Sequence, residues 1–223
     1  MNLLNKDFVE SVPNEFGTEN MALFLYSFIL FTRPLNIIEV GSGYSSLFIA
    51  QAIEDVKNNV TNALDFRGPN RRKFSKDRKK YMEGYNPNFT IVEEDLAFDD
   101  QAFRFETLHK YKSINKISGD IRDYLKIDGD EKYDMVYLDF GDGTEYLKYF
   151  NIFWKKLEEG GSIFFHNTLN NHAARRCLAE LKLLQRYEKD MEVTSFWEPH
   201  KKEQNSFTIV KKNKDYPIYY DRA

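Results

Sequence analysis

Strand-like and helix-like segments alternate along most of the chain, and this alternation restricts the fold more than any other feature of the sequence. Short apolar runs predict strands at 36–40, 89–95, 114–118, 133–139 and 162–167. Apolar residues at helical spacing predict helices at 46–57, 99–111, 121–126, 144–158 and 171–188. Such an alternation is typical of an α/β fold in which helices cover both faces of a parallel sheet.

The last two predicted strands, 192–197 and 206–212, have no helix between them. Eight residues separate them, which suits an antiparallel hairpin and is too short for a crossover between parallel strands. We therefore expect a Rossmann-like sheet of seven strands, mostly parallel, with an antiparallel last strand at its end.

Two segments lie outside this pattern. Residues 1–34 predict an N-terminal helical cap, which ends because Pro34 cannot continue a helix. Residues 58–88 contain the run RRKFSKDRKK and predict a basic insertion between the first helix and the second strand. We interpret 1–223 as a single domain, since one α/β domain often reaches this size.

The composition excludes several classes of protein. The chain is 42% hydrophobic with a net charge of −3, which predicts a globular protein without general attraction to nucleic acids or membranes. The single cysteine, Cys177, excludes a disulfide framework. Met21–Phe31, the longest apolar stretch, is too short to span a bilayer, and no signal-peptide pattern begins the sequence. We expect a cytoplasmic location, and a homodimer is compatible with the sequence.

Polar residues follow the first five predicted strands, where each strand ends. They comprise the segment Glu39–Ser46, then Glu93, Glu94 and Asp95, then Asp120, then Asp139, and finally His166 and Asn167. Ligands of open α/β sheets bind at the carboxyl ends of the strands. The sequence therefore predicts a binding site along this edge.

Two stretches resemble class I S-adenosylmethionine-dependent methyltransferases of the small O-methyltransferase type. "IIEVGSGYSS" at 37–46 is similar to the glycine loop of that family. "YDMVYLDF" at 133–140, followed by "YFNIFWKKLEEGGSIFFHN" at 149–167, is similar to its fourth strand, helix and fifth strand. The resemblance covers about residues 35–212 and includes the reversed last strand.

The resemblance implies S-adenosylmethionine as the cofactor and S-adenosylhomocysteine as the product. Glu39 would face the methionyl ammonium, Glu93 or else Glu94 would hold the ribose hydroxyls, and Asp139 would lie near the methionyl end. Asp120 would bind the adenine amino group, with Ile121 against the ring. The loop residues Gly41, Ser42, Gly43, Tyr44 and Ser45 complete the predicted cofactor site, because glycine lets the backbone approach a ligand closely. Ser45 is also a candidate N-cap of the following helix.

Other interpretations remain open at this stage. The acids at 93–95 could be a solvated strand end, and Asp120 could cap the helix that follows it. A dinucleotide-binding dehydrogenase would need a third glycine at position 46, where the chain has Ser46. An RNA methyltransferase would use the basic insertion, but that segment is predicted to emerge at the opposite end of the sheet. A non-catalytic binding module on the same fold is the remaining alternative.

The end of the fifth strand bears on metal binding. The metal-dependent branch of the family has Asp-Asn there, whereas this chain has His166-Asn167. The loss of one carboxylate argues against a Mg²⁺ site, so we predict no metal. Asp139, His166 and Asn167 are the predicted catalytic residues, with His166 as the candidate base.

Cations near the active edge predict the charge of the acceptor. They are Arg175, Arg176, His200, Lys201 and Lys202. Such residues favour an anion, and we expect a small-molecule or peptide carboxylate, such as a peptide C-terminus or side chain in natural-product tailoring. A hydroxyl or phenol acceptor, with His166 as the base, is the alternative.

Overall fold

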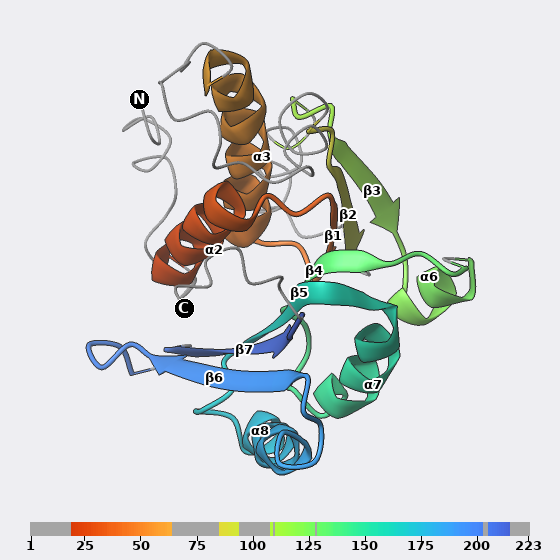
Figure 1. Ribbon diagram of the computed structural model, residues 1–223. Coiled ribbons are helices and arrows are strands. Elements are labelled where there is room, and N and C mark those ends of the chain that lie inside the picture. The colour runs from red at the N-terminus through yellow and green to blue at the C-terminus, as the bar shows by residue number, and fades with distance from the viewer. Residues whose placement is uncertain are drawn as a thin grey trace, which may run out of the picture. The chain divides into compact units, whose positions relative to one another are not determined.

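The computed structural model describes residues 19–63, 85–93, 108, 110–127, 129–202 and 205–214. The chain divides into two compact units, Met1–Glu131 and Lys132–Ala223, which we describe in turn. Figure 1 labels the elements of both units.

The first unit contains a parallel sheet with the strand order β3-β2-β1. Its strands are β1 (Asn36–Val40), β2 (Asn88–Glu93) and β3 (Ile114–Ser118). Ile37, Ile38 and Val40 are buried in β1, as the apolar run predicts. The bounds of β1 and β3 agree with the prediction, whereas β2 starts one residue early. Glu94, Asp95 and most of the helix predicted at 99–111 lie outside the described residues.

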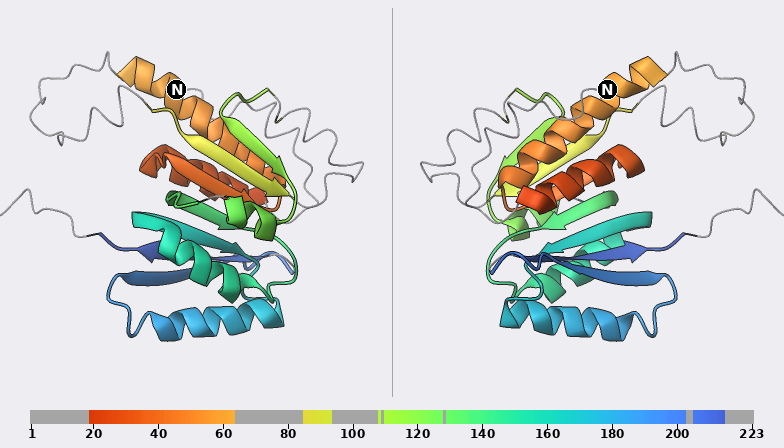
Figure 2. Two further views of the ribbon diagram at one scale, coloured as in Figure 1. Left: turned by 90° about the vertical axis from the view of Figure 1, so that its right-hand side faces the viewer. Right: turned by 90° about the vertical axis from the view of Figure 1, so that its left-hand side faces the viewer.

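In the described part of this unit, three helices accompany the sheet: α2 (Glu19–Thr32), α3 (Tyr44–Ala63) and α6 (Ile121–Ile127). Figure 2 shows α2 and α3 side by side, and the hydroxyl of Tyr26 on α2 donates a hydrogen bond to Asp55 Oδ2 on α3 at 2.6 Å. Because α3 continues to Ala63, residues 58–63 are helical rather than part of the predicted insertion. Residues 1–18 of the predicted cap and 64–84 of the insertion lie outside the described part.

The second unit contains a mixed sheet with the strand order β4-β5-β7-β6. Its elements are β4 (Tyr133–Leu138), α7 (Tyr146–Lys156), β5 (Leu157–His166), α8 (His172–Leu184), β6 (Met191–Trp197) and β7 (Ser206–Lys212). The strand β5 runs parallel to β4, whereas β7 is antiparallel to both β5 and β6. The helix α7 packs on β4 and β5, and α8 packs on β6 (Figures 1 and 2).

The hairpin of β6 and β7 is confirmed, but the predicted place of the reversed strand is wrong. The strand β7 lies between β5 and β6, so β6 rather than β7 forms the edge of this sheet. Burial explains the order: most of β7 is buried, including Thr208 and Val210, whereas exposed and covered residues alternate along much of β6. A strand that is covered on both faces is the better central strand.

The segment before β5 also differs from the prediction. The helix expected at 144–158 ends at Lys156, and β5 begins at Leu157 instead of residue 162. Leu157 pairs with Tyr133, with a register shift between Tyr133 and Met135. Gly160 and Gly161 therefore lie in an irregular part of the strand, where Gly160 has a positive φ of 85°.

No helix among the described residues is both long and apolar enough to cross a membrane.

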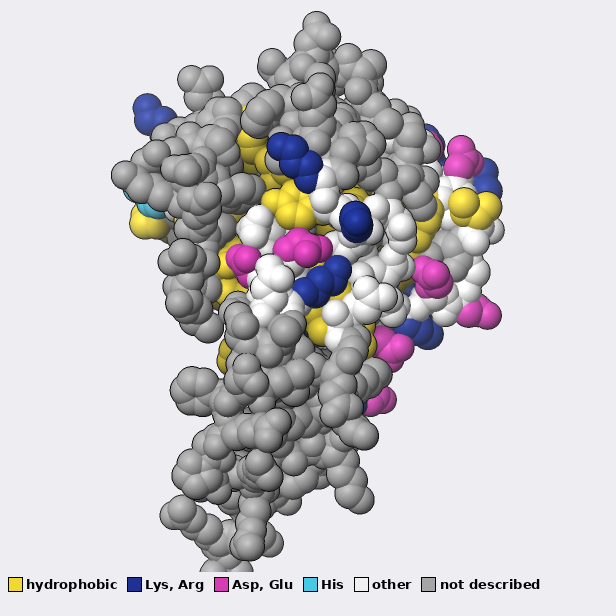
Figure 3. Space-filling model, turned by 90° about the horizontal axis from the view of Figure 1, so that it is seen from above, with side chains coloured by type: hydrophobic (Ala, Val, Ile, Leu, Met, Phe, Trp, Pro, Cys, Tyr) yellow, Lys and Arg dark blue, Asp and Glu magenta, His cyan; other side chains and the backbone are white. Residues whose placement is uncertain are grey.

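On the face in Figure 3, the Lys and Arg side chains of the described residues are interspersed with Asp and Glu side chains. The cytoplasmic location and the single-domain organisation stay predictions.

Candidate active site

In the first unit, the glycine loop joins the carboxyl end of β1 to α3. Gly41 has a φ of 93°, a left-handed conformation that favours glycine, and its amide donates a hydrogen bond to Val92 O at 2.9 Å. Since α3 already begins at Tyr44, Ser45 lies inside the helix and the prediction that it is the N-cap is wrong. Its hydroxyl instead donates to Glu39 Oε1 at 2.6 Å. Glu39 and Ser45 are both fully buried.

Glu93 ends the neighbouring strand β2 and contacts the same loop. The amide of Ser42 donates a hydrogen bond to Glu93 Oε2 at 2.5 Å. This contact places the Glu93 carboxylate beside the glycine loop. Glu94, the predicted alternative for the ribose, lies outside the described residues.

Asp120 follows the third strand and directly precedes α6. Its Oδ1 accepts a hydrogen bond from the amide of Arg122 at 2.7 Å, and its carboxylate pairs with the Arg122 guanidinium. Asp120 therefore caps α6, as one of the two interpretations of this residue predicted, while Ile121 beside it is buried. The first unit thus carries Glu39, Glu93 and Asp120 at the carboxyl ends of three adjacent strands.

In the second unit, Asp139 directly follows β4 and His166 is the last residue of β5, and these two strands are paired. Asp139 Oδ1 lies 2.7 Å from His166 Nδ1, and the Tyr137 hydroxyl donates to Asp139 Oδ2 at 2.8 Å. Burial is the largest influence on the pKa of Asp139 and raises it. The charge of His166 and the hydrogen bonds from His166 and Tyr137 together outweigh burial, so the pKa of Asp139 is lowered. Asp139 is consequently a carboxylate at neutral pH.

Neutral groups hold the backbone around His166. The Tyr146 hydroxyl donates to His166 O at 3.2 Å, and burial raises the pKa of Tyr146 far above its usual range, which keeps it protonated. The next residue, Asn167, has a φ of 53° and its amide donates to Ser206 O at 2.6 Å. This left-handed residue turns the chain out of β5.

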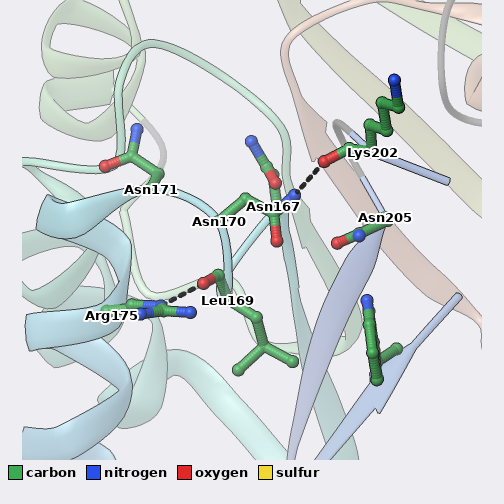
Figure 4. A pocket seen from close by; sticks show the side chains of 8 residues that line it. Asn167, Leu169, Asn170, Asn171, Arg175, Lys202 and Asn205 are labelled. Carbon is green, nitrogen blue, oxygen red and sulfur yellow. Dashed lines mark hydrogen bonds between the residues drawn. The ribbon is translucent and has the colours of Figure 1, made fainter. Parts of the chain in front are cut away.

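A cavity of about 860 Å³ opens beside Asn167 (Figure 4). Its volume is within the usual range for small-molecule sites. Among the described residues, four amide side chains, two cations and two apolar side chains line it: Asn167, Asn170, Asn171, Asn205, Arg175, Lys202, Leu169 and Trp197.

The structure separates the five predicted substrate-binding cations into two groups. Arg175 and Lys202 line the cavity, and the Nε of Arg175 donates a hydrogen bond to Leu169 O. Arg176, His200 and Lys201 are not among its lining residues.

Glu198 explains the positions of two of the cations outside the cavity. Its Oε2 lies 3.1 Å from Lys201 Nζ and 3.5 Å from His200 Nε2. The sequence shows only that these cations are clustered. Their contacts with Glu198 distinguish Lys201 and His200 from Lys202, which lines the cavity.

The four lining asparagines include three that sequence reasoning missed, namely Asn170, Asn171 and Asn205. Asn171 is the N-cap of α8, whose side-chain oxygen accepts hydrogen bonds from the amides of Ala173 and Ala174. Asn205 precedes β7, and because β7 is reversed, its start lies beside the end of β5. The reversed strand was the sequence signal that could have identified Asn205.

Among the described residues, no three His, Cys, Asp or Glu side chains gather closely enough to hold a metal ion. The metal-free site stays a prediction, and so do the roles of the individual residues.

The comparisons with known proteins identify the family. A model of the methyltransferase domain matches residues 38–168, which is more than half of the chain. No curated protein matches the chain.

Solved structures match across both units. One is the O-methyltransferase TomG from Streptomyces achromogenes, with a TM-score of 0.64 and 15% identity, over 96% of this chain and 93% of that chain. Another is an O-methyltransferase from Bacillus cereus, with a TM-score of 0.64 and 14% identity, over 96% and 94%. A methyltransferase from Podospora anserina matches with a TM-score of 0.57 and 14% identity, over 93% and 87%.

These likenesses confirm the predicted Rossmann-like α/β fold with seven strands and an antiparallel last strand. The chain belongs to the methyltransferase domain family.

Proposed function

We propose that the chain is an S-adenosylmethionine-dependent O-methyltransferase that methylates a hydroxyl group of a small molecule, with His166 as the base. The observation that carries this proposal is the 2.7 Å contact between His166 Nδ1 and Asp139 Oδ1. This contact supports a hydroxyl acceptor, which the sequence left as the alternative to a carboxylate. A hydroxyl must lose a proton, whereas a carboxylate has none to lose at neutral pH.

Two of the matched structures support the cofactor, since TomG is in complex with S-adenosylmethionine and the Bacillus cereus enzyme with S-adenosylhomocysteine. The first unit has residues that fit this group. Buried Glu39 is suited to an ammonium, Glu93 to hydroxyl donors, and the positive φ of Gly41 to a backbone close to a ligand. When bound, the cofactor supplies a methyl group on a sulfonium.

The lowered pKa of Asp139 assigns the proton within the Asp139–His166 pair. An ionised carboxylate only accepts hydrogen bonds, so Nδ1 of His166 is the donor. When the imidazolium releases its Nε2 proton, Nδ1 keeps its hydrogen bond to Asp139, and Nε2 carries the lone pair that can take the proton of a hydroxyl. His166 is followed directly by Asn167, which lines the cavity. A positioned base of this kind contributes about 10²–10⁴-fold in rate.

A carboxylate acceptor, giving a methyl ester, is the second candidate. Arg175 and Lys202 favour it because both line the cavity and, among the described residues, no acid lines it. A peptide that ends in a carboxylate belongs to this candidate. His166 would then have no proton to remove.

Product chemistry tests the two candidates. The protein is incubated with S-adenosylmethionine and a panel of phenols, hydroxy acids and carboxylic acids without hydroxyls, and methylated products are identified by mass spectrometry. We expect an ether, which resists mild alkali, whereas an alkali-labile ester would favour the second candidate.

EDTA should leave turnover unchanged. If EDTA abolishes turnover and Mg²⁺ restores it, the metal-free prediction is wrong.

A further inference from the structure

Asn205 is a buried amide in the wall of the cavity, at the start of β7. It is 4% exposed and lies among the lining residues. Figure 4 shows Asn205 and Lys202 on one side of the cavity, with Asn171 and Arg175 on the other. Asn205 therefore lies where a bound molecule would contact it.

Hydrogen bonds fix the orientation of this amide. Its Nδ2 donates to Lys201 O at 2.8 Å, and the backbone O of Asn205 accepts from the Glu198 amide at 2.6 Å. The nitrogen is thus used, and no described residue donates a hydrogen bond to the buried Oδ1. A buried acceptor without a donor is destabilising, so a bound group that supplies the donor would gain affinity.

A second amide oxygen at the same end of the sheet has the same property. The Oδ1 of Asn167 is also buried, and no donor to it is present in the described part of the chain. His166 pairs with Phe207 in the β5–β7 register, and the Asn167 amide donates to Ser206 O, so Asn167 and Asn205 are close along the paired strands. Two acceptors thus occur in a cavity that two cations also line.

We propose that Asn205 determines acceptor specificity by accepting a hydrogen bond through Oδ1, while Arg175 and Lys202 bind an anionic group of the same molecule. The acceptor is accordingly an anion that also carries an N–H or O–H donor. This inference rests on the proposed function, because it assigns the cavity to the methyl acceptor.

Substituted benzoates are suitable probes, because they combine an anion with a second group of defined chemistry. The probes are meta-hydroxybenzoate and meta-aminobenzoate, which donate, and meta-methoxybenzoate, which does not. Each is titrated by calorimetry into the full chain, alone and with S-adenosylhomocysteine. We expect the donors to bind about tenfold more tightly than the methoxy compound, as one hydrogen bond to a buried acceptor implies.

Asn205→Leu should reduce this ratio to about one and leave the affinity for meta-methoxybenzoate nearly unchanged. Asn213→Leu, at an exposed asparagine after β7, is the matched control and should keep the ratio. If Asn205→Leu does not fold, Asn205→Ala replaces it. The affinity ratio of the benzoates for the wild-type chain is itself a test and requires no variant.

Three results would overturn the proposal: equal affinity for donors and methoxy compound, a ratio that persists without Asn205, or no binding of any benzoate at millimolar concentration. Failure to bind S-adenosylhomocysteine is a separate result and would contradict the proposed function. The ratio of benzoate affinities tests the role of Asn205 whether or not S-adenosylhomocysteine binds.

Discussion

The Nδ1 atom of His166 lies 2.7 Å from the Oδ1 atom of Asp139, so that the polar residues following β4 and ending β5 form one hydrogen-bonded pair. The pair is held from three directions, by Tyr137 on Asp139, by Tyr146 on the His166 backbone, and by the turn at Asn167. A group fixed in this way would lose little entropy in the proposed role of a base.

The Asp139–His166 pair should make stability depend on pH in the acid range. The pKa of Asp139 is below its ordinary 3.8 in the folded protein, so the unfolded chain binds more protons as the pH falls. The contribution of Asp139 is therefore complete above the unfolded pKa and is lost as the pH falls through the folded pKa. Urea unfolding of the wild type and Asp139→Asn should show a stability difference at neutral pH that narrows below about pH 4. A difference that is constant with pH would disagree with this assignment.

Glu93→Ala should weaken binding of S-adenosylmethionine by roughly 10–100-fold, since a hydrogen bond to a charged group contributes about 1.5–3 kcal/mol. Glu93→Gln should bind at an intermediate level, because it keeps an acceptor oxygen for the Ser42 amide. Calorimetry measures both, with Glu158→Ala at an exposed acid of β5 as the control. Unchanged affinity in Glu93→Ala would remove Glu93 from the cofactor site.

Arg175→Ala should raise the KM for an anionic acceptor more than it lowers kcat, which is the pattern of lost ground-state binding. The neighbouring exposed cation is the matched control, because Arg176 does not line the cavity and Arg176→Ala should behave as the wild type. The wild-type KM should also rise with salt, since ions screen exposed charges beyond about 8 Å at physiological strength. Equal effects of the two alanine variants would mean that the cavity does not bind the anion.

Gly143→Ala should destabilise the second unit by about 2–4 kcal/mol, which combines backbone strain and overpacking. Gly143 has a φ of 80°, and an added Cβ would lie 2.8 Å from the Cβ of Ala174, near the start of α8. Gly141→Ala is the matched control, because Gly141 also has a positive φ, 59°, but no atom within 4 Å of an added Cβ. It should cost only about 1–2 kcal/mol. Urea unfolding compares them, and equal losses would exclude close packing at Gly143.

Local sequence signals predicted most of the elements that position the site. Pro34 and Gly119 lie next to β1 and β3, and the bounds of both strands agree with the prediction. Within the first unit, Glu39 and Glu93 lie near or at the carboxyl ends of β1 and β2 and Asp120 follows β3. Within the second unit, Asp139 follows β4 and His166 ends β5.

The features that the sequence did not predict depend on contacts between distant residues. Apolar periodicity identifies β7 as a strand but does not specify that it inserts between β5 and β6. The pairing of Leu157 with Tyr133 extends β5 through a segment that resembles a helix end and a glycine turn. Similarly, Glu198 contacts Lys201 and His200, and the number of charges in the sequence does not distinguish these two residues from Lys202.

The rate of methyl transfer by His166→Ala tests the central claim most directly. The assay measures S-adenosylhomocysteine formation with the best acceptor of the panel, for the wild type and for the variant saturated with cofactor and acceptor. The account predicts an alkali-stable product and a loss of about 10²–10⁴-fold in kcat, the usual contribution of a general base. A variant that retains the full wild-type rate would contradict the assignment of His166 as the base, and an alkali-labile product would contradict the hydroxyl acceptor.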